Sequence, residues 1–219
     1  CGMMLSHFLL GFAEGLSGYD RINTTQFCSA FRRGAQSLRE ALDKPVEGTI
    51  LTVIHDTALA ATQSTEKDFV PLLEHLIKEA RNSLERTPDL LPVLKTAGVV
   101  DAGAKGFVSL LEGVLYLVDG SLPISAESQE HEKVAASPVS LMDYPVNQER
   151  FRFCTEALVH GDSLPTQTSV QSTLRDTGDS MIVIRSDNVL KIHIHTDEPE
   201  QVFDYLRDLG DLVAHKAED

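Results

Sequence analysis

The stretch Val189-Leu190-Lys191-Ile192-His193-Ile194-His195-Thr196 alternates between apolar and polar residues, which is the pattern of a half-buried β-strand. Residues two apart on a strand point to the same side, so His193 and His195 share one face and Ile192 and Ile194 share the other. Two adjacent imidazoles are a pair of ligands that zinc uses in proteins. A solvated strand face is the more common explanation of such a histidine pair. Whether the pair is a metal site therefore depends on the other residues that lie beside it.

The segments around this strand predict a small α+β domain over residues 149–219. Apolar alternation and turn residues indicate the order βαββαβ, with a hairpin turn at Asp187-Asn188. This order is typical of the split-βαβ, ferredoxin-like arrangement. We therefore expect the first and third strands to be parallel neighbours at the centre of the sheet. The expected strands are 151–159, 180–186, 189–196 and 211–215, and the expected helices are 168–176 and 199–209.

Cys154 lies on the first expected strand of this domain. Phe151 and Phe153 are expected to face the helices, which places Cys154 on the opposite, open face of the sheet. The two histidines are expected on the same face of the neighbouring strand. A cysteine and two histidines suit zinc and leave a fourth coordination position open. The alternative is a partly buried polar cluster without a metal.

Residues 1–120 show helical periodicity throughout, and no strand-like alternation interrupts it. This half of the chain therefore predicts an all-α helical bundle. The residues expected at helix ends are Thr24 or Thr25 and Asp68 as N-terminal caps, Thr87-Pro88 and Gly98 as the start and end of a short fifth helix, and Asp101 and Gly120 around the sixth.

Residues 121–148 differ from both halves. They contain three prolines and many Ser, Glu and Ala residues without periodicity. This composition predicts a mobile, solvated linker between the helical domain and the α+β domain.

The composition of the 219 residues limits the class of protein. The net charge of −14 argues against a surface for nucleic acid or anionic membranes, and nucleotide phosphates would need a bridging divalent metal. Three scattered cysteines form no disulfide framework and fit the cytoplasm. No apolar run is long enough for an integral membrane segment. Because the chain begins with Cys1 rather than methionine, we interpret it as a fragment.

Two helix starts have features of an anion site. At Asp101-Ala102-Gly103, free N–H groups and the positive end of the helix dipole favour an anion. Thr49, after Gly48, places a hydroxyl at the start of the third helix, where capping is the more common role. Gly106 and Gly113, on one stripe with Gly103, would allow close approach of a backbone or a ligand, and tight helix packing is the more common explanation.

Five segments closely resemble the bacterial fatty acid kinase subunit. They are KPVEGTILTVI (44–54), TPDLLPVLK (87–95), AGVVDAG (97–103), FCTE (153–156) and VLKIHIHTD (189–197). The first three lie in a domain that is similar to the nucleotide-binding subunit of dihydroxyacetone kinases. The last two match the middle domain of the fatty acid kinase protein. The resemblance spans nearly the whole chain.

The resemblance implies an α-helical barrel that binds ATP and magnesium, then a middle domain that holds zinc through Cys154, His193 and His195. The implied reaction is phosphorylation of a fatty acid, presented by a separate carrier protein, to acyl phosphate. A homodimer in the cytoplasm is expected. The residues implied around the nucleotide are Gly2 on the loop over the phosphates, Gly48, Thr49 and Ile50 beside the nucleotide, Lys95 where the dihydroxyacetone kinases have arginine, and Asp101, Ala102 and Gly103 at their Asp-Pro-Gly turn.

The chain departs from the family pattern at both ends. The magnesium-binding aspartates of the family are expected upstream of Cys1, and its carrier-docking domain is expected after Asp219. Phosphoryl transfer depends on positioning and on neutralisation of charge by magnesium. The chain is therefore interpreted as part of an ATP-dependent kinase that is inactive alone, and no catalytic residue is assigned.

Two alternatives of other classes stay open. The Cys154/His193/His195 site could activate a zinc-bound water for hydrolysis, with Glu156 or Asp197 as the base. Alternatively, zinc could be structural in a non-catalytic dimerisation module. The first alternative needs a fourth coordination position that water can reach, and the second needs a closed site or a ligand from a partner.

Overall fold

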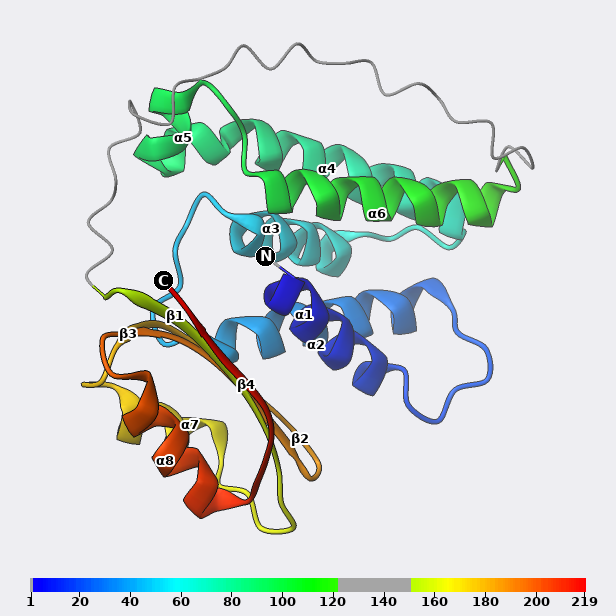
Figure 1. Cartoon of the computed structure of the whole chain (residues 1–219). Coiled ribbons are helices and arrows are strands. Elements are labelled where there is room, and N and C mark those ends of the chain that lie inside the picture. Colours follow the sequence, from blue (N-terminus) through cyan, green and yellow to red (C-terminus); the bar gives the residue numbers. More distant parts are fainter. Residues whose placement is uncertain (1, 122–150) are drawn as a thin grey trace.

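The computed structural model describes residues 2–121 and 151–219, so the predicted linker lies outside the described residues except for Ser121. A domain of six helices is followed by a four-stranded antiparallel sheet with two helices (Figure 1), which confirms the predicted fold class. No described helix has both the length and the apolar character needed to cross a membrane. The elements are α1 Gly2–Gly15, α2 Thr24–Ala41, α3 Ile50–Gln63, α4 Phe69–Leu90, α5 Pro92–Ala97, α6 Ala102–Asp119, β1 Phe153–His160, α7 Gln167–Leu174, β2 Asp179–Ser186, β3 Val189–Thr196, α8 Pro199–Leu209 and β4 Asp211–Glu218.

Phenylalanine rings form the centre of the helical domain. The ring of Phe31 on α2 lies 4.9 Å from that of Phe8 on α1 and 6.2 Å from that of Phe107 on α6, measured between centroids. All three side chains are buried. The close approach of α1 and α2 depends on Gly11 and Gly34, because a Cβ at Gly34 would lie 2.6 Å from the carbonyl oxygen of Phe8. Glycines thus allow these two helices to pack backbone against backbone.

One of the predicted helix caps is wrong, at the start of α2. The N-terminal cap of α2 is Asn23, whose side chain accepts a hydrogen bond from the backbone N–H of Gln26 at 2.9 Å, while Gln26 caps Asn23 in return. Thr24 is already inside the helix and is buried. Asp68 does precede α4, but its side chain makes no capping hydrogen bond. Gly98, with a φ of 66°, ends α5 as predicted.

The predicted helix start at Thr87-Pro88 is also wrong, because α4 continues through Pro88 to Leu90. A proline inside a helix cannot donate to the carbonyl four residues earlier, here that of Leu84. The hydroxyl of Thr87 donates to this carbonyl at 2.7 Å instead. The next helix, α5, begins at Pro92, where a missing N–H costs nothing.

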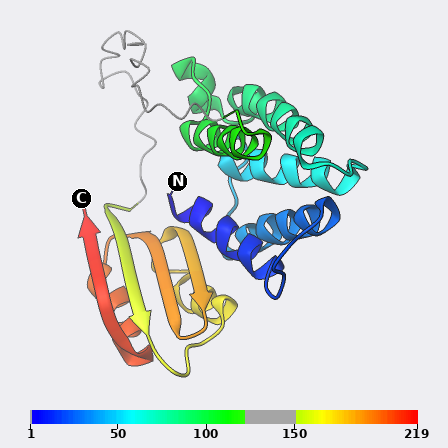
Figure 2. The same cartoon turned by 90° about the vertical axis from the view of Figure 1, so that its right-hand side faces the viewer.

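The four strands lie in the order β2-β3-β1-β4, with α7 and α8 on one face of the sheet (Figure 2). β1 and β3 are neighbours as predicted, but they are antiparallel, so the predicted parallel pairing is wrong. Helix α7 connects β1 to β2, and β3 lies between these two strands in the sheet. Because β3 forms an antiparallel hairpin with β2, it also runs antiparallel to β1. Ile192, Ile194 and Val159 are buried beneath the two helices.

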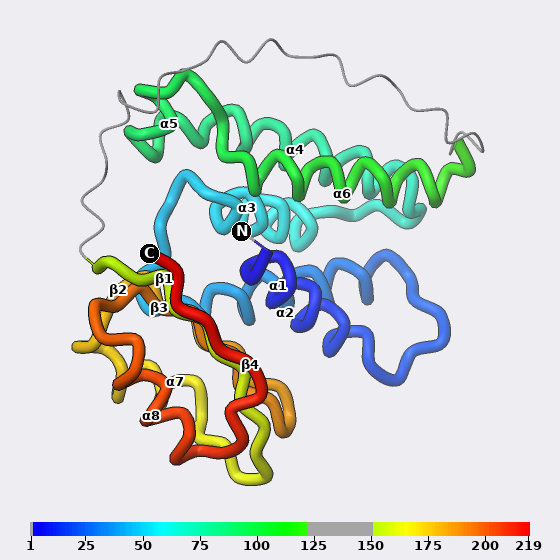
Figure 3. Tube along the Cα trace, in the orientation of Figure 1, coloured from blue at the N-terminus to red at the C-terminus, as the bar shows by residue number. Residues whose placement is uncertain are grey.

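The two domains contact each other directly, which the sequence pattern did not predict. After α2 the chain runs along the edge strand β2 before it reaches α3 (Figure 3), and Leu42 forms an isolated antiparallel bridge with Ile182. The side chain of Gln171 on α7 donates to the backbone carbonyl of Ala41 at 3.0 Å, and both residues are buried. Arg175 forms an ion pair with Asp43 at 3.4 Å.

Replacement of Gln171 by methionine is expected to weaken this domain contact. The side chain keeps its size, but the buried carbonyl of Ala41 loses its donor, which costs about 1–3 kcal/mol. The free energy of unfolding in urea, followed by circular dichroism, measures the loss. Arg175→Ala is the control, because the Arg175 side chain is 61% exposed and its ion pair with Asp43 at 3.4 Å is expected to contribute less than the buried hydrogen bond of Gln171. Equal effects of the two changes would contradict a specific role for the buried hydrogen bond.

Candidate metal centre and nucleotide-site residues

The pairing of β1 with β3 brings Cys154, His193 and His195 onto one face of the sheet. Cys154 is paired with His195, and Glu156 is paired with His193. The residues between them on β1 and β3, such as Thr155 and Ile194, are buried on the helix-covered side. The predicted facing of the three side chains therefore holds even though the predicted strand direction does not, because facing depends only on the period of two.

The three side chains lie close enough to share one metal ion. One possible ligand atom from each lies within 4.8 Å of the other two. The Sγ atom of Cys154 is 3.9 Å from Nδ1 of His193, and the two histidine rings are 5.2 Å apart between centroids. All three residues are partly buried, so a bound ion would be partly shielded from solvent.

The protonation of His193 favours metal binding. Burial of the ring lowers its pKa, while the hydrogen bond with the carboxylate of Glu156 acts in the opposite direction. A lowered pKa keeps the imidazole neutral near pH 7, and the neutral form is the one that binds a metal. Thiolate and imidazole ligands together suit zinc and other borderline or soft transition metals rather than magnesium or calcium. The donor set of this cluster therefore fits a transition metal.

Three of the candidate nucleotide-site residues contact the C-terminal end of α4. Gly48 packs against Leu91, with a φ of 81° and 2.7 Å between its would-be Cβ and the Cβ of Leu91. Lys95 is paired with Asp89 at 3.3 Å. The backbone N–H of Asp101 donates to the hydroxyl of Thr87 at 3.2 Å. Gly48, which is distant in sequence, thus contacts the same helix end as Lys95 and Asp101, which follow α4 directly.

Both candidate helix starts already have capping residues. The carboxylate of Asp101 accepts from the N–H of Ala104 at 2.7 Å, and the hydroxyl of Thr49 accepts from the N–H of Leu51 at 3.3 Å. Thr49 also donates to the carbonyl of Val46. Ile50 follows as the first residue of α3, and Ala102 and Gly103 as the first two of α6. An anion at either helix start would have to bind the backbone N–H groups that the capping side chains do not occupy.

The remaining candidate glycines have few close neighbours in the structure. Gly2 begins α1 and has no heavy atom within 4 Å of a Cβ built on it, and Cys1 lies outside the described residues. Gly106 and Gly113 on α6 also have nothing within 4 Å of such a Cβ. The predicted tight packing at these two glycines is therefore wrong for the part of the chain that the structure describes.

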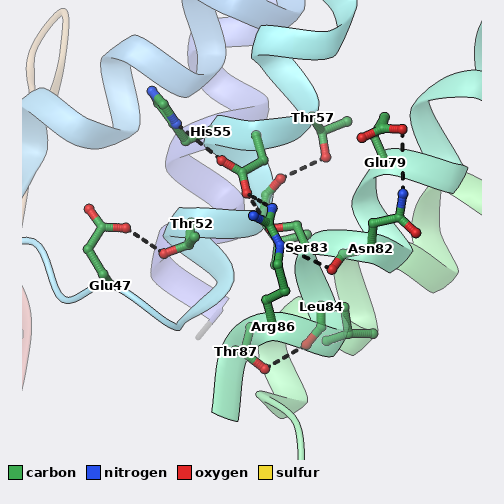
Figure 4. Close-up of polar contacts among 12 residues, drawn as sticks. Glu47, Thr52, His55, Thr57, Glu79, Asn82, Ser83, Leu84, Arg86 and Thr87 are labelled. Carbon is green, nitrogen blue, oxygen red and sulfur yellow. Dashed lines mark hydrogen bonds and ion pairs between the residues drawn. The ribbon is translucent and has the colours of Figure 1, made fainter. Parts of the chain in front are cut away.

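A polar cluster between α3 and α4 was missed in the sequence. Ser83 and Arg86 of α4, both labelled in Figure 4, donate hydrogen bonds to the carboxylate of Asp56 on α3. The distances are 2.6 Å from the hydroxyl of Ser83 and 2.8 Å from a guanidinium nitrogen of Arg86. Ser83 is buried. The only signal in the sequence was a charged residue within the mostly apolar stretch 50–63. The cluster joins two helices by charge-assisted hydrogen bonds.

The fold and the site define a protein with a helical domain and a small α+β domain that presents a Cys/His/His cluster. Residues 1–116 match the model of the DAK2 domain, and residues 150–219 match the model of the FakA-like middle domain of fatty acid kinases. The chain therefore belongs to the DAK2 domain family and carries a FakA-like middle domain, which confirms the resemblance found in the sequence. It is a kinase-related protein.

The relatives cover the whole chain but are much longer. An uncharacterised protein of Staphylococcus saprophyticus is 38% identical, and protein YloV of Bacillus subtilis is 37% identical. An uncharacterised protein of Staphylococcus haemolyticus is 35% identical. In each comparison 99% of this chain is aligned with 41% of the relative. The chain thus spans about two fifths of the length of these relatives.

Proposed function

We propose that the chain is part of an ATP-dependent phosphotransferase that converts a carrier-bound fatty acid to acyl phosphate. The observation that carries this proposal is the presence, in one chain, of a DAK2 domain followed by a FakA-like middle domain. The helical domain would supply the nucleotide-binding segments around Gly48–Ile50, Lys95 and Asp101–Gly103. A fatty-acid-binding carrier protein, a homodimer and a cytoplasmic location belong to the same proposal.

In this proposal the middle domain holds a zinc ion through Cys154, His193 and His195. The support is geometric, because three suitable ligand atoms lie within 4.8 Å of one another on adjacent strands. Zinc would tie β1 to β3 near the domain contact, since Ile182, which meets Leu42 of the helical domain, is also the cross-strand neighbour of His193. Zinc would thereby stabilise the sheet on the side where the two domains meet.

The nucleotide part of the proposal is tested by calorimetry. The 219-residue chain is expected to bind magnesium-ATP weakly or undetectably, because no magnesium-binding aspartates are assigned within it and charge neutralisation by magnesium dominates phosphate binding in such sites. A longer homologous protein, such as full-length YloV, is expected to bind ATP in a magnesium-dependent way. Formation of acyl phosphate should in addition require a fatty-acid carrier protein.

The control for this test compares substitutions at two exposed lysine positions, made in the longer homologous protein. Replacement by alanine at the position that corresponds to Lys95 is expected to weaken nucleotide binding, while the same change at Lys44 is expected to have little effect. Tight magnesium-ATP binding by the 219-residue chain would show that the phosphate site needs no further carboxylates. Absence of ATP binding by the full-length relative would contradict the proposed function itself.

A further inference from the structure

A groove runs along the surface between the neighbouring helices α2 and α3 (Figure 1). Its larger hollow, of about 350 Å³, lies between residues 32–39 of α2 and 55–62 of α3. Its smaller hollow, of about 230 Å³, lies between residues 24–32 of α2 and 61–67 at the end of α3. Arg32 lines both hollows, so they adjoin at this residue.

The larger hollow has an apolar lining. Ala35 of α2 and Ala58 of α3 form its floor and are almost completely buried, while Leu59 beside them is 51% exposed. The hollow extends over about two helical turns, or about 10 Å. An aliphatic chain in this position would cover the exposed leucine, and removal of apolar surface from water is favourable.

The ionisable residues that line the larger hollow are all basic in the described part of the chain. They are Arg32, Arg39 and His55, in a protein whose net charge is −14. Arg39 is paired with Glu47 at 3.5 Å and His55 with Asp56 at 3.6 Å. Within residues 2–121 and 151–219, no hydrogen bond or ion pair involves the guanidinium of Arg32. This guanidinium is therefore available to an anion.

The smaller hollow adds polar groups beside Arg32. Its lining includes the hydroxyl-bearing side chains of Ser29 and Thr65 and the ammonium group of Lys67, with Glu66 as the acidic residue among them. Guanidinium and ammonium groups form charge-assisted hydrogen bonds with carboxylate and phosphate oxygens. The groove thus has a cationic, hydroxyl-lined part next to an apolar part.

We propose that this groove binds a single-chain anionic amphiphile, either a fatty acid or an alkyl phosphate. The anionic head group lies at Arg32, where the two hollows meet, and the aliphatic chain lies in the larger hollow along Leu59. None of the residues proposed for the nucleotide lines the groove. The inference therefore goes beyond the proposed phosphotransferase function and does not depend on it.

Calorimetry with the intact 219-residue chain tests the site, using laurate and dodecyl phosphate below their micelle concentrations. Saturable binding of one equivalent is expected. Binding of either compound supports the site, and the tighter of the two identifies the head group. Decanoate should bind more weakly than laurate, by up to about fourfold for each CH₂ removed, which is the value for complete burial.

A cationic amphiphile separates this site from non-specific adsorption. A chain with a net charge of −14 attracts cations in general. Dodecyltrimethylammonium is nevertheless expected to bind at least about tenfold more weakly than laurate, because it cannot accept the hydrogen bonds of Arg32.

Two substitutions with matched controls locate the ligand. Arg32→Ala should weaken binding by about tenfold, whereas Arg33→Ala should change it by less than about twofold, because Arg33 is paired with Glu14 outside the groove. Leu59→Asp should weaken binding by more than about tenfold, whereas Leu117→Asp on the exposed face of α6 should have little effect. All four residues are exposed, and circular dichroism checks that the variants fold.

Cys28 provides a measurement that needs no substitution. It lies one turn before Arg32 on α2 and lines the smaller hollow. Laurate is expected to slow alkylation of Cys28 but not of Cys154, which lies on β1 in the other domain. Because burial raises the pKa of the Cys28 thiol, the reaction is followed at alkaline pH.

Three results would overturn the proposal. They are equal binding of laurate and dodecyltrimethylammonium, equal losses in the Arg32 and Arg33 variants, and binding to vesicles of anionic phospholipid without binding of free laurate or dodecyl phosphate. The last result would assign the groove to a membrane surface instead. None of them bears on magnesium-dependent ATP binding by a longer relative, which tests the proposed function separately.

Discussion

Replacement of His193 by alanine is expected to remove the bound metal. The wild-type chain should carry one zinc ion, and the variant should lose more than about 100-fold in affinity, because a direct ligand contributes more than the residues that only support one. The α+β domain should unfold at a lower temperature, since binding of a metal to the folded state alone is part of the folding free energy. Metal analysis by mass spectrometry and thermal unfolding with and without a chelator measure both effects.

His160→Ala serves as the control, because His160 is an exposed histidine at the end of β1 in the same sheet. It should leave metal content and unfolding temperature unchanged, and the helices should stay folded in both variants. Metal affinity in the wild type should fall as the pH is lowered, because protons compete for the thiolate and the imidazoles. Since burial lowers the pKa of His193, protons should compete for this residue only below the usual range for histidine. Full zinc content in the His193 variant would contradict the site.

Replacement of Phe31 by alanine is expected to produce the largest loss of stability in the helical domain. Phe31 is 1% exposed, and its ring contacts those of Phe8, Phe12, Phe27 and Phe107. Truncation of a buried phenylalanine typically costs about 3–5 kcal/mol, through lost burial and the cavity left behind. Chemical denaturation monitored by circular dichroism measures this free energy of unfolding.

Two further variants show whether the effect comes from packing. Phe31→Leu should lose less than Phe31→Ala, because a smaller cavity remains. Leu117→Ala on α6 should change the free energy of unfolding by less than about 0.5 kcal/mol, because Leu117 is 66% exposed. A loss at Leu117 as large as that at Phe31 would mean that the exposed face of α6 is buried in solution.

The sequence by itself determined which residues share a face. Alternation along 189–196 and around Cys154 placed a cysteine and two histidines on the open side of the sheet, and helical stripes gave the all-α first half. Gly98 and Asp101 were also correctly predicted at helix ends. These features depend on local geometry, the period of two in strands and of 3.6 in helices, and so they can be recognised without knowledge of distant contacts.

Other features depended on which local option the rest of the fold favours. The cap of α2 is Asn23 because its carbonyl side chain reaches the N–H of Gln26, although Thr24 and Thr25 are suitable residue types. α4 continues past Thr87 because the hydroxyl of Thr87 satisfies the carbonyl that Pro88 leaves without its usual donor. Residue preferences allow several solutions at each of these places, and hydrogen bonding in the folded helix selects one.

Only the tertiary structure decided how distant segments meet. The antiparallel direction of β1 and β3, the contact of Ala41 and Leu42 with the second domain, and the cluster around Asp56 join residues that are far apart in sequence. The same is true of Glu156, whose two oxygens reach toward His193 on one neighbouring strand and Lys216 on the other. The sequence places a carboxylate on the metal-facing side, but its distance from the ligands follows from strand order and register, which are set by the packing of the whole sheet against its helices.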